Sequence, residues 1–230
     1  YTILHKPFES KIFWHYSETE EVEEVKDIKN EIIRETFKIF NVDKPIEITT
    51  LADIPSGTGL GSSGSFGVGL IHALYPKSAK INLANAASKI QMDKLNYPIG
   101  FQDQYIAAYG GINEYVIDMI GNIKVRPLKI NYNQLQDKLV MFYTGIKRDT
   151  NQVLSKSTTE GLKEIQELAY EAKDALKGQN FDKYGLLLNK HWDLKKKRGG
   201  MTNSEINRYY ALGLKNGALG GKLIGAGGGG

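Results

Sequence analysis

A segment rich in glycine and hydroxyl side chains, residues 53–74, could bind phosphate. It reads D-I-P-S-G-T-G-L-G-S-S-G-S-F-G-V-G-L-I-H-A-L, with four glycines and four Ser or Thr side chains from Gly57 to Ser65. The apolar run from Phe66 to Leu74 follows at once and is typical of a helix. A glycine-rich turn before a helix directs several backbone N–H groups to one place, where the helix dipole also favours negative charge. The segment therefore predicts a phosphate site.

Better-known motifs fit this segment poorly. A P-loop places a Lys directly after its last glycine, and the chain has no Lys between Gly57 and Leu74. The G-x-G-x-x-G spacing of residues 59–64 also occurs in dinucleotide-binding folds, but these require an acid about 20 residues further on, where the chain has only Lys77 and Lys80. A flexible Gly/Ser linker is disfavoured because hydrophobic segments flank the glycines on both sides.

A second candidate for chemistry is Asp103, in the segment G-F-Q-D-Q. Phosphoryl transfer to a hydroxyl needs a carboxylate that accepts or orients the hydroxyl proton. Asp103 lies between Gln102 and Gln104 and before the paired Gly110 and Gly111, which is an unusual place for a merely solvating acid. On these residues alone, a catalytic aspartate and a surface-loop aspartate remain alternatives.

A third segment, residues 217–230, reads G-A-L-G-G-K-L-I-G-A-G-G-G-G. Successive glycines let the backbone pass close to a substrate or a phosphate because no Cβ intervenes. A glycine-rich tail could also be disordered, but Leu219, Leu223 and Ile224 argue for an ordered loop and strand.

Together, the three segments resemble the GHMP kinases, the superfamily of galactokinase, homoserine kinase and mevalonate kinase. The family's second motif, P-x-x-x-G-L-G-S-S-A-A, is matched from Pro55 to Ser63, after which Gly64 and Ser65 replace the two alanines. The G-x-Q-D-Q segment resembles the catalytic segment in the form used by heptose kinases, and residues 217–230 resemble the third motif. The family's first motif is missing.

The resemblance implies an α+β fold of two subdomains, with nucleotide and substrate bound in the cleft between them. It implies ATP and Mg²⁺ as cofactors, Asp103 as the catalytic residue and Ser63 as a metal ligand, since a hydroxyl suits this hard ion. The expected ATP phosphate site comprises Pro55, Gly57, Thr58, Gly59, Leu60, Gly61, Ser62, Ser63, Gly64 and Ser65. The expected substrate site comprises Gln102, Gly110, Gly111, Arg148, Gly225, Ala226, Gly227 and Gly228.

The metal site departs from the pattern of the family. Where this branch places an acid, on the helix before the catalytic segment, the chain has Gln91. Asp93 is a poor substitute, because residues two apart do not share a helix face. Ser62 and Ser63 could also serve as helix N-caps. The second Mg²⁺ ligand therefore stays open.

The resemblance implies phosphorylation of a sugar phosphate, with D-glycero-D-manno-heptose 7-phosphate and its 1,7-bisphosphate as the expected substrate and product, for nucleotide-heptose and surface polysaccharide synthesis. One alternative is another sugar kinase of the family, similar to fucokinase or galactokinase. The other is a non-catalytic nucleotide-binding relative, which Gln91 would suit.

The composition of the chain bears on whether a membrane or a nucleic acid is a partner. The 230 residues include 41% hydrophobic residues and no cysteine, with a formal net charge of +4. The chain shows no membrane span and no export signal, so we expect a cytoplasmic protein without a membrane partner. We interpret the basic cluster from Lys195 to Arg198 as a solvated helix end rather than a nucleic-acid site, because aromatic residues do not interleave it. His191 and Trp192 are expected to pack rather than to act as bases. The oligomeric state stays open, with a homodimer as one possibility.

Hydrophobic patterning predicts the elements that position these segments. We expect an ATP-binding subdomain over residues 1–150 and a helical one over 151–230. Because the chain lacks an initial Met and ends within a glycine run, we also expect further residues before Tyr1 and after Gly230. Strands are expected at residues 11–16, 45–51 and 139–143, a hairpin at 114–130, and helices from residues 17–20 to Phe40 and at 66–74, 81–95, 158–176, 181–197 and 204–214.

Overall fold

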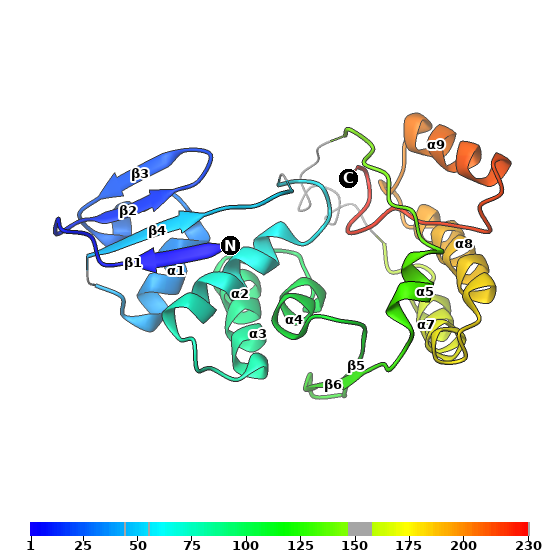
Figure 1. Ribbon diagram of the computed structural model, residues 1–230, viewed down its shortest axis with the longest axis horizontal. Helices are drawn as coiled ribbons and strands as arrows, with labels where there is room; N and C mark the ends of the chain where they lie inside the picture. Colours follow the sequence, from blue (N-terminus) through cyan, green and yellow to red (C-terminus); the bar gives the residue numbers. More distant parts are fainter. Residues whose placement is uncertain (44, 55, 147–157, 230) are drawn as a thin grey trace. The chain divides into compact units, whose positions relative to one another are not determined.

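The computed structural model describes residues 1–43, 45–54, 56–146 and 158–229. The chain is α+β, as predicted, and forms two compact units (Figure 1). The first comprises Tyr1–Ser56 and Gly61–Gly110, and the second comprises Gly57–Leu60 and Gly111–Gly230. The predicted boundary between the two subdomains near residue 150 stays a prediction.

The first unit is built on a four-stranded sheet in the order β1-β4-β2-β3. Its strands are β1 (Thr2–His5), β2 (Ile12–His15), β3 (Thr19–Val22) and β4 (Ile46–Thr50). Strand β4 runs parallel to β2 and antiparallel to β1, and β3 runs antiparallel to β2. In β2, Ile12 and Trp14 are buried while the alternate residues are partly exposed, as the two-residue period of a strand requires. The strands expected near residues 11–16 and 45–51 are confirmed.

Strand β3 corrects the prediction that the acidic stretch 17–20 leads into a helix. The inward-facing Glu20 is only 7% exposed, and its carboxylate accepts hydrogen bonds from the backbone N–H groups of Lys29 and Asn30. These bonds satisfy the buried acid, so that an acidic sequence can pair with β2.

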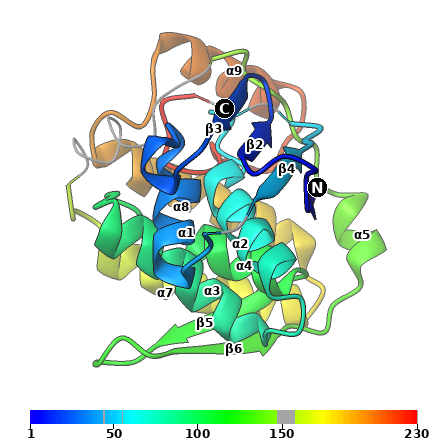
Figure 2. The same cartoon turned by 90° about the vertical axis from the view of Figure 1, so that its left-hand side faces the viewer.

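Helices α1 (Glu31–Phe40) and α2 (Ser62–Leu74) cover one face of this sheet (Figures 1 and 2). Helix α1 begins after Asn30, whose side chain caps the N–H of Ile33 at 3.1 Å. A short 3-10 turn, η1 (Val25–Asp27), precedes it. The core between the helices and the sheet consists of Ile12, Trp14, Ile28, Ile33, Phe37, Ile48 and Leu70.

Helix α2 also packs against α3 (Lys80–Lys89) and α4 (Gln102–Tyr109). Helix α3 continues into a π-helical turn, η2 (Ile90–Lys94), so the helix predicted at 81–95 is confirmed with a change of pitch. The second core cluster joins these helices through Val68, Ile71, Leu83, Ala87 and Ile90.

The second unit combines a hairpin with helices. The hairpin pairs β5 (Asn113–Ile117) with β6 (Ile123–Pro127) around Gly121, as predicted. Helices α7 (Leu162–Lys177) and α8 (Phe181–Lys197) pack together, and the described residues also form α5 (Tyr132–Gln136) and α9 (Ser204–Lys215). The three predicted C-terminal helices are therefore confirmed.

The predicted buried strand at 139–143 is wrong. The segment forms no strand, and its five apolar side chains are between 47% and 80% exposed. A β-strand needs a neighbour to pair with, and the composition of a segment does not reveal whether that neighbour exists.

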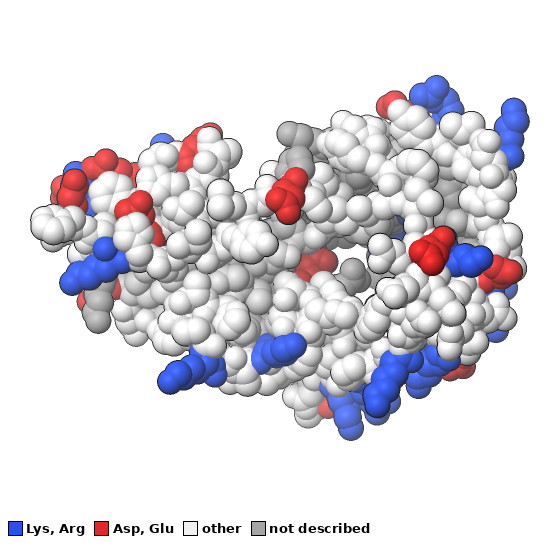
Figure 3. All heavy atoms as spheres, in the orientation of Figure 1, with Lys and Arg blue, Asp and Glu red and all other residues white. Residues whose placement is uncertain are grey.

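Figure 3 shows side chains of both charge signs on the face drawn, with Lys and Arg most frequent along its lower edge. Among the described residues, no helix is both long and apolar enough to cross a membrane.

Candidate active site

The predicted phosphate segment forms the N-terminus of α2. Gly61 is the N-cap residue, with a φ of 71°, and the first backbone hydrogen bond of the helix runs from the N–H of Ser65 to the carbonyl of Gly61 at 2.9 Å. The N–H groups of residues 62–64 therefore have no acceptor within the helix, as in the first turn of any helix. The alternative that Ser62 or Ser63 is the N-cap is wrong, because Gly61 takes that position without a side-chain cap.

Asp103 lies directly against this helix end. A Cβ built on Gly61 would lie 3.1 Å from the Asp103 Cγ and 3.4 Å from its Oδ1. A Cβ built on Gly64 would lie 2.8 Å from the Asp103 Cβ and 3.0 Å from its carbonyl carbon. Both glycines are therefore needed for the approach, and at Gly64 even one methyl group would force a shift.

Asp103 does not lie in a surface loop, which was one of the two alternatives. It is half-buried in the first turn of α4, where a negative charge interacts favourably with the helix dipole. The glycine-rich segment and the G-x-Q-D-Q segment, separate in the sequence, thus meet at two helix N-termini.

Gln91 stands where an acid was expected and forms a buried hydrogen-bonded bridge between two helices. Its side chain is fully buried, and its Nε2 donates a hydrogen bond to the carbonyl of Ser63 at 2.9 Å. Its Oε1 accepts a 2.7 Å hydrogen bond from Gln104, the neighbour of Asp103. A Cβ on Gly67 would lie 2.9 Å from the Gln91 Nε2, so this glycine makes room for the amide. Gln91 therefore connects α2 with α4 and does not offer a carboxylate to a metal.

The residues present suit Mg²⁺ only together with phosphate. Among the residues that the structure describes, no group of three or more His, Cys, Asp or Glu side chains could hold a metal ion. Ser63 is exposed in the first turn of α2, beside the N–H groups that have no acceptor within the helix. Mg²⁺ commonly binds one or two protein oxygens and completes its shell with phosphate oxygens and water. A hydroxyl on a phosphate cradle fits this mode.

Other predicted site residues lie apart in the chain. Gln102 is exposed at the start of α4, and Gly110 ends that helix with a φ of 66°. Gly111 belongs to the second unit, beside Tyr132, as does the segment Gly57–Leu60, in which Thr58 is buried. Pro55 and Arg148 lie outside the described residues.

The third glycine segment forms a turn at residues 225–228 of the second unit. Gly225, Gly227 and Gly228 have φ values of 71°, 104° and 77°, which favour glycine. Gly227 packs against Met201, and the N–H of Gly228 donates to the Met201 carbonyl at 2.9 Å. Residues 225–228 therefore form a loop, as predicted, but the strand expected with it is wrong, because Leu223 and Ile224 belong to no strand.

The basic cluster on α8 corrects a prediction. Lys195 was expected to be solvated but is only 7% exposed. Its Nζ donates hydrogen bonds to the carbonyls of Leu223 and Gly225, just before and within the glycine turn. Sequence reasoning missed this residue because three exposed or half-exposed basic residues follow it.

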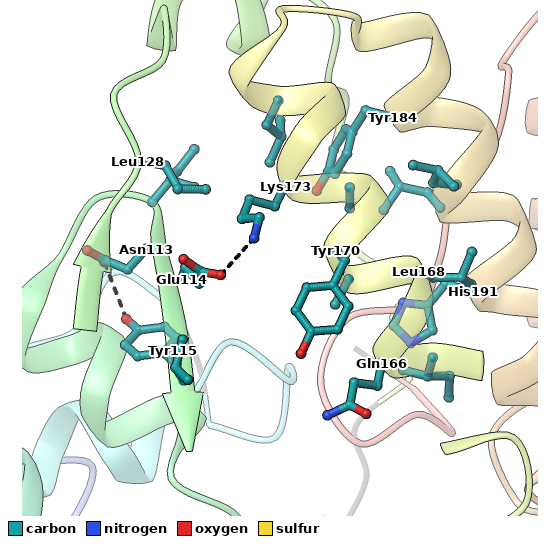
Figure 4. A pocket seen from close by; sticks show the side chains of 18 of the residues that line it. Asn113, Glu114, Tyr115, Leu128, Gln166, Leu168, Tyr170, Lys173, Tyr184 and His191 are labelled. Atoms are coloured by element: carbon teal, nitrogen blue, oxygen red, sulfur yellow. Dashed lines mark hydrogen bonds and ion pairs between the residues drawn. The ribbon is translucent and has the colours of Figure 1, made fainter. Parts of the chain in front are cut away.

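The second unit also contains a cavity of about 480 Å³ between the hairpin and helices α7 and α8 (Figure 4). Glu114 and Lys173 form an ion pair on its wall at 2.9 Å, and the hydrogen bond from Lys173 holds the pKa of Glu114 below its usual value. His191 and Lys222 also line the cavity, and the Nζ of Lys222 lies 3.2 Å from the Nδ1 of His191. Burial and then the Lys222 charge lower the pKa of His191 to about 4, so His191 is neutral at pH 7. Trp192 is fully buried, which agrees with the packing expected for it.

The chain matches known protein families and individual known proteins. Residues 25–111 match the GHMP kinases N terminal domain, and residues 172–230 match the GHMP kinases C terminal domain. The chain is 31% identical over 223 residues to D-glycero-alpha-D-manno-heptose 7-phosphate kinase of Campylobacter jejuni, covering 89% of this chain and 64% of that protein. It is 26% identical over 251 residues to the galactokinase of Pyrococcus furiosus, covering 91% of this chain and 68% of that protein.

A solved structure is also similar. The crystal structure of a proposed sugar kinase from Campylobacter jejuni superposes with a TM-score of 0.74 at 30% identity, covering 99% of this chain and 74% of that one. The similarity therefore extends over nearly the whole chain, while about a quarter of the solved structure has no counterpart in it.

Proposed function

Because the chain belongs to the GHMP kinase family, we propose that the protein is a kinase that transfers the γ-phosphoryl group of ATP to a hydroxyl of a sugar phosphate. The finer proposal is that the acceptor is D-glycero-D-manno-heptose 7-phosphate and that the product is the 1,7-bisphosphate. The heptose kinase relative supports this choice, although the chain spans 64% of its length.

One observation carries the proposal: Asp103 lies against the glycine-lined N-terminus of α2. The three N–H groups at that end, with the helix dipole, are suited to the phosphates of ATP. A carboxylate beside them is suited to the hydroxyl that attacks the γ-phosphorus. Phosphoryl transfer to an alcohol requires a proton acceptor beside a phosphate cradle, and the closeness of Asp103 to this helix end supports the proposal.

In the proposed reaction the sugar oxygen forms a bond to the γ-phosphorus while the bond between that phosphorus and the ADP oxygen breaks. Asp103 accepts the hydroxyl proton, and the N–H groups of residues 62–64 stabilise charge on the phosphate oxygens. Bound Mg²⁺, held by Ser63 and phosphate oxygens, would neutralise further charge. Gln91 and Gln104 keep α2 and α4 in register so that the two groups stay in place.

A substrate panel tests the proposal. Heptose 7-phosphate, free galactose and free fucose are each incubated with ATP and Mg²⁺, and ³¹P NMR identifies the phosphorylated position. We expect turnover of the heptose phosphate, with a new phosphate ester at the anomeric carbon. Turnover of galactose or fucose alone would overturn the choice of substrate and keep the kinase.

A non-catalytic nucleotide-binding function is the second candidate, because Gln91 gives the site no second carboxylate. Calorimetry distinguishes the two. ATP binding that does not depend on Mg²⁺, together with no turnover of any sugar in the panel, would favour the non-catalytic protein.

A further inference from the structure

We infer that Lys195 is a positioning residue that aims the backbone N–H groups of Ile224 and Ala226, next to and within the 225–228 turn, at a bound phosphate group. The inference rests on the proposed function, because the phosphate group that the turn would bind belongs to a substrate of the proposed kinase. It adds a residue outside the three segments singled out in the sequence, at the C-terminal end of α8.

Lys195 is buried although its side chain carries a charge. Burying an ammonium group is costly unless hydrogen bonds replace its water. Lys195 donates two of its three N–H bonds to backbone carbonyls, those of Leu223 and Gly225. Its neighbours on α8 differ: Lys196 is half-exposed and pairs with Asp193 at 2.9 Å, and Lys197 is exposed. Of these three lysines, Lys195 is the buried one, and it donates hydrogen bonds to the backbone at the glycine turn.

Peptide geometry gives the second step. In a trans peptide unit the C=O and the N–H point in opposite directions, and the described backbone contains no cis peptide bond. Because the carbonyls of Leu223 and Gly225 point at Lys195, the N–H groups of Ile224 and Ala226 point away from it. Lys195 therefore turns two alternate amide donors toward the opposite side of the chain.

A second support fixes the same turn. The Met201 carbonyl accepts from the N–H of Gly228, and a Cβ on Gly227 would lie 2.9 Å from the Met201 sulfur and 3.0 Å from its Cα. The turn is thus held by hydrogen bonds at Gly225 and Gly228 and by close packing between them. Donors held in this way need no reorganisation when an anion binds.

The test compares Lys195→Met with Lys197→Met in the full chain. Both variants remove one positive charge from the last turn of α8, but Lys197 is exposed and contacts no part of the glycine turn in the contacts of the described residues. Hydrogen exchange measured by mass spectrometry reports on residues 223–229, and steady-state kinetics gives kcat and KM for the sugar phosphate. We expect faster exchange in that segment and a loss of about 10²-fold in kcat/KM for Lys195→Met only.

Lys195→Arg is the conservative variant, and we expect it to restore most of the exchange protection because a guanidinium can donate to both carbonyls. It also serves if the Met variant does not fold. Exchange and kinetics equal to those of Lys197→Met would overturn the inference. If the wild-type protein shows no kinase activity, exchange still tests whether Lys195 holds the turn, and phosphate protection of residues 224–228 tests whether the turn binds an anion.

Discussion

The two glycine-rich segments are supported in different ways. At residues 61–65 the N–H groups belong to the first turn of α2, and the 13-residue helix behind them sets their direction. At residues 225–228 no helix follows within the described chain, and the turn is held by Lys195 and Met201. A helix end orients its amides through its own hydrogen-bond pattern, whereas an irregular turn needs side chains from elsewhere in the fold.

The role of glycine differs accordingly. Gly61 and Gly64 remove side chains so that Asp103 can approach the helix end. Gly225 and Gly228 instead supply positive φ angles that other residues rarely adopt. The first segment therefore depends on space and the second on conformation, and substitutions should separate these two requirements.

The largest effect is expected at Asp103. Asp103→Asn keeps the shape and removes the basicity, so we expect kcat to fall by roughly 10²–10⁴-fold. ATP affinity should change little, because the N–H groups of α2 stay in place. Calorimetry with ATP and steady-state kinetics measure the two effects separately. Asp93→Asn is the control, since Asp93 is exposed on η2 and should retain normal turnover. Near-normal turnover of Asp103→Asn would remove this residue from the mechanism.

A smaller loss is expected for Gly64→Ala, which tests the requirement for space. The added Cβ would lie 2.8 Å from the Asp103 Cβ and must push α4 away. A displacement of this kind costs about 10²-fold in kcat/KM. Ala favours a helix by about 1 kcal/mol over Gly, which offsets part of the cost of the close contact. We therefore expect the loss of activity to exceed what the change in thermal stability alone would cause.

Gly69→Ala is the matched control on the same helix. Its Cβ would lie 3.1 Å from the Thr2 Oγ1 and would have no Asp103 atom within 4 Å, and the Thr2 side chain can rotate aside. We expect near-normal kinetics for this variant. Equal activity of both alanine variants would show that α4 tolerates the added methyl group and that space is not the requirement at Gly64.

Much of this architecture follows from local sequence. The helix after the first glycine-rich segment, the hairpin at Gly121 and the C-terminal helices were predicted because periodicity and turn residues are local signals. The segment 139–143 was predicted wrongly because strand formation depends on a partner elsewhere in the chain. Strand β3 was missed because the buried Glu20 is satisfied by N–H groups nine and ten residues away.

The sequence predicted which residues belong to the candidate site better than it predicted their burial and their contacts. Asp103 and Gly64 were both expected in a site, but the absence of room between them is a tertiary property. The burial of Lys195 is likewise hidden in a run of four basic residues. For Gln91 the sequence shows a missing acid, and only the fold shows that its amide bridges Ser63 and Gln104.

The smallest effect is expected for Gln91→Glu, which restores the family's acid and tests the support of the first segment. A carboxylate at this position would face the Ser63 carbonyl without a proton to donate. Burial raises the pKa of such an acid, so the folded state binds a proton more tightly than the unfolded chain. Stability is then retained below about pH 4, where the acid is protonated in both states, and falls as pH rises through the raised pKa. At pH 8 we expect a loss of about 1–3 kcal/mol, the usual cost of an unsatisfied buried polar group.

Urea unfolding of Gln91→Glu at pH 4 and pH 8 measures this difference, relative to the wild-type protein at each pH. Gln136→Glu, at an exposed position on α5, should show no comparable difference because its carboxylate stays in water. A Gln91→Glu variant as stable as the wild type at pH 8, with stronger Mg²⁺ dependence of turnover, would contradict the bridging role. That result would mean that the acid leaves the Ser63 carbonyl and reaches the metal, so α2 and α4 would not need the amide bridge to stay in register.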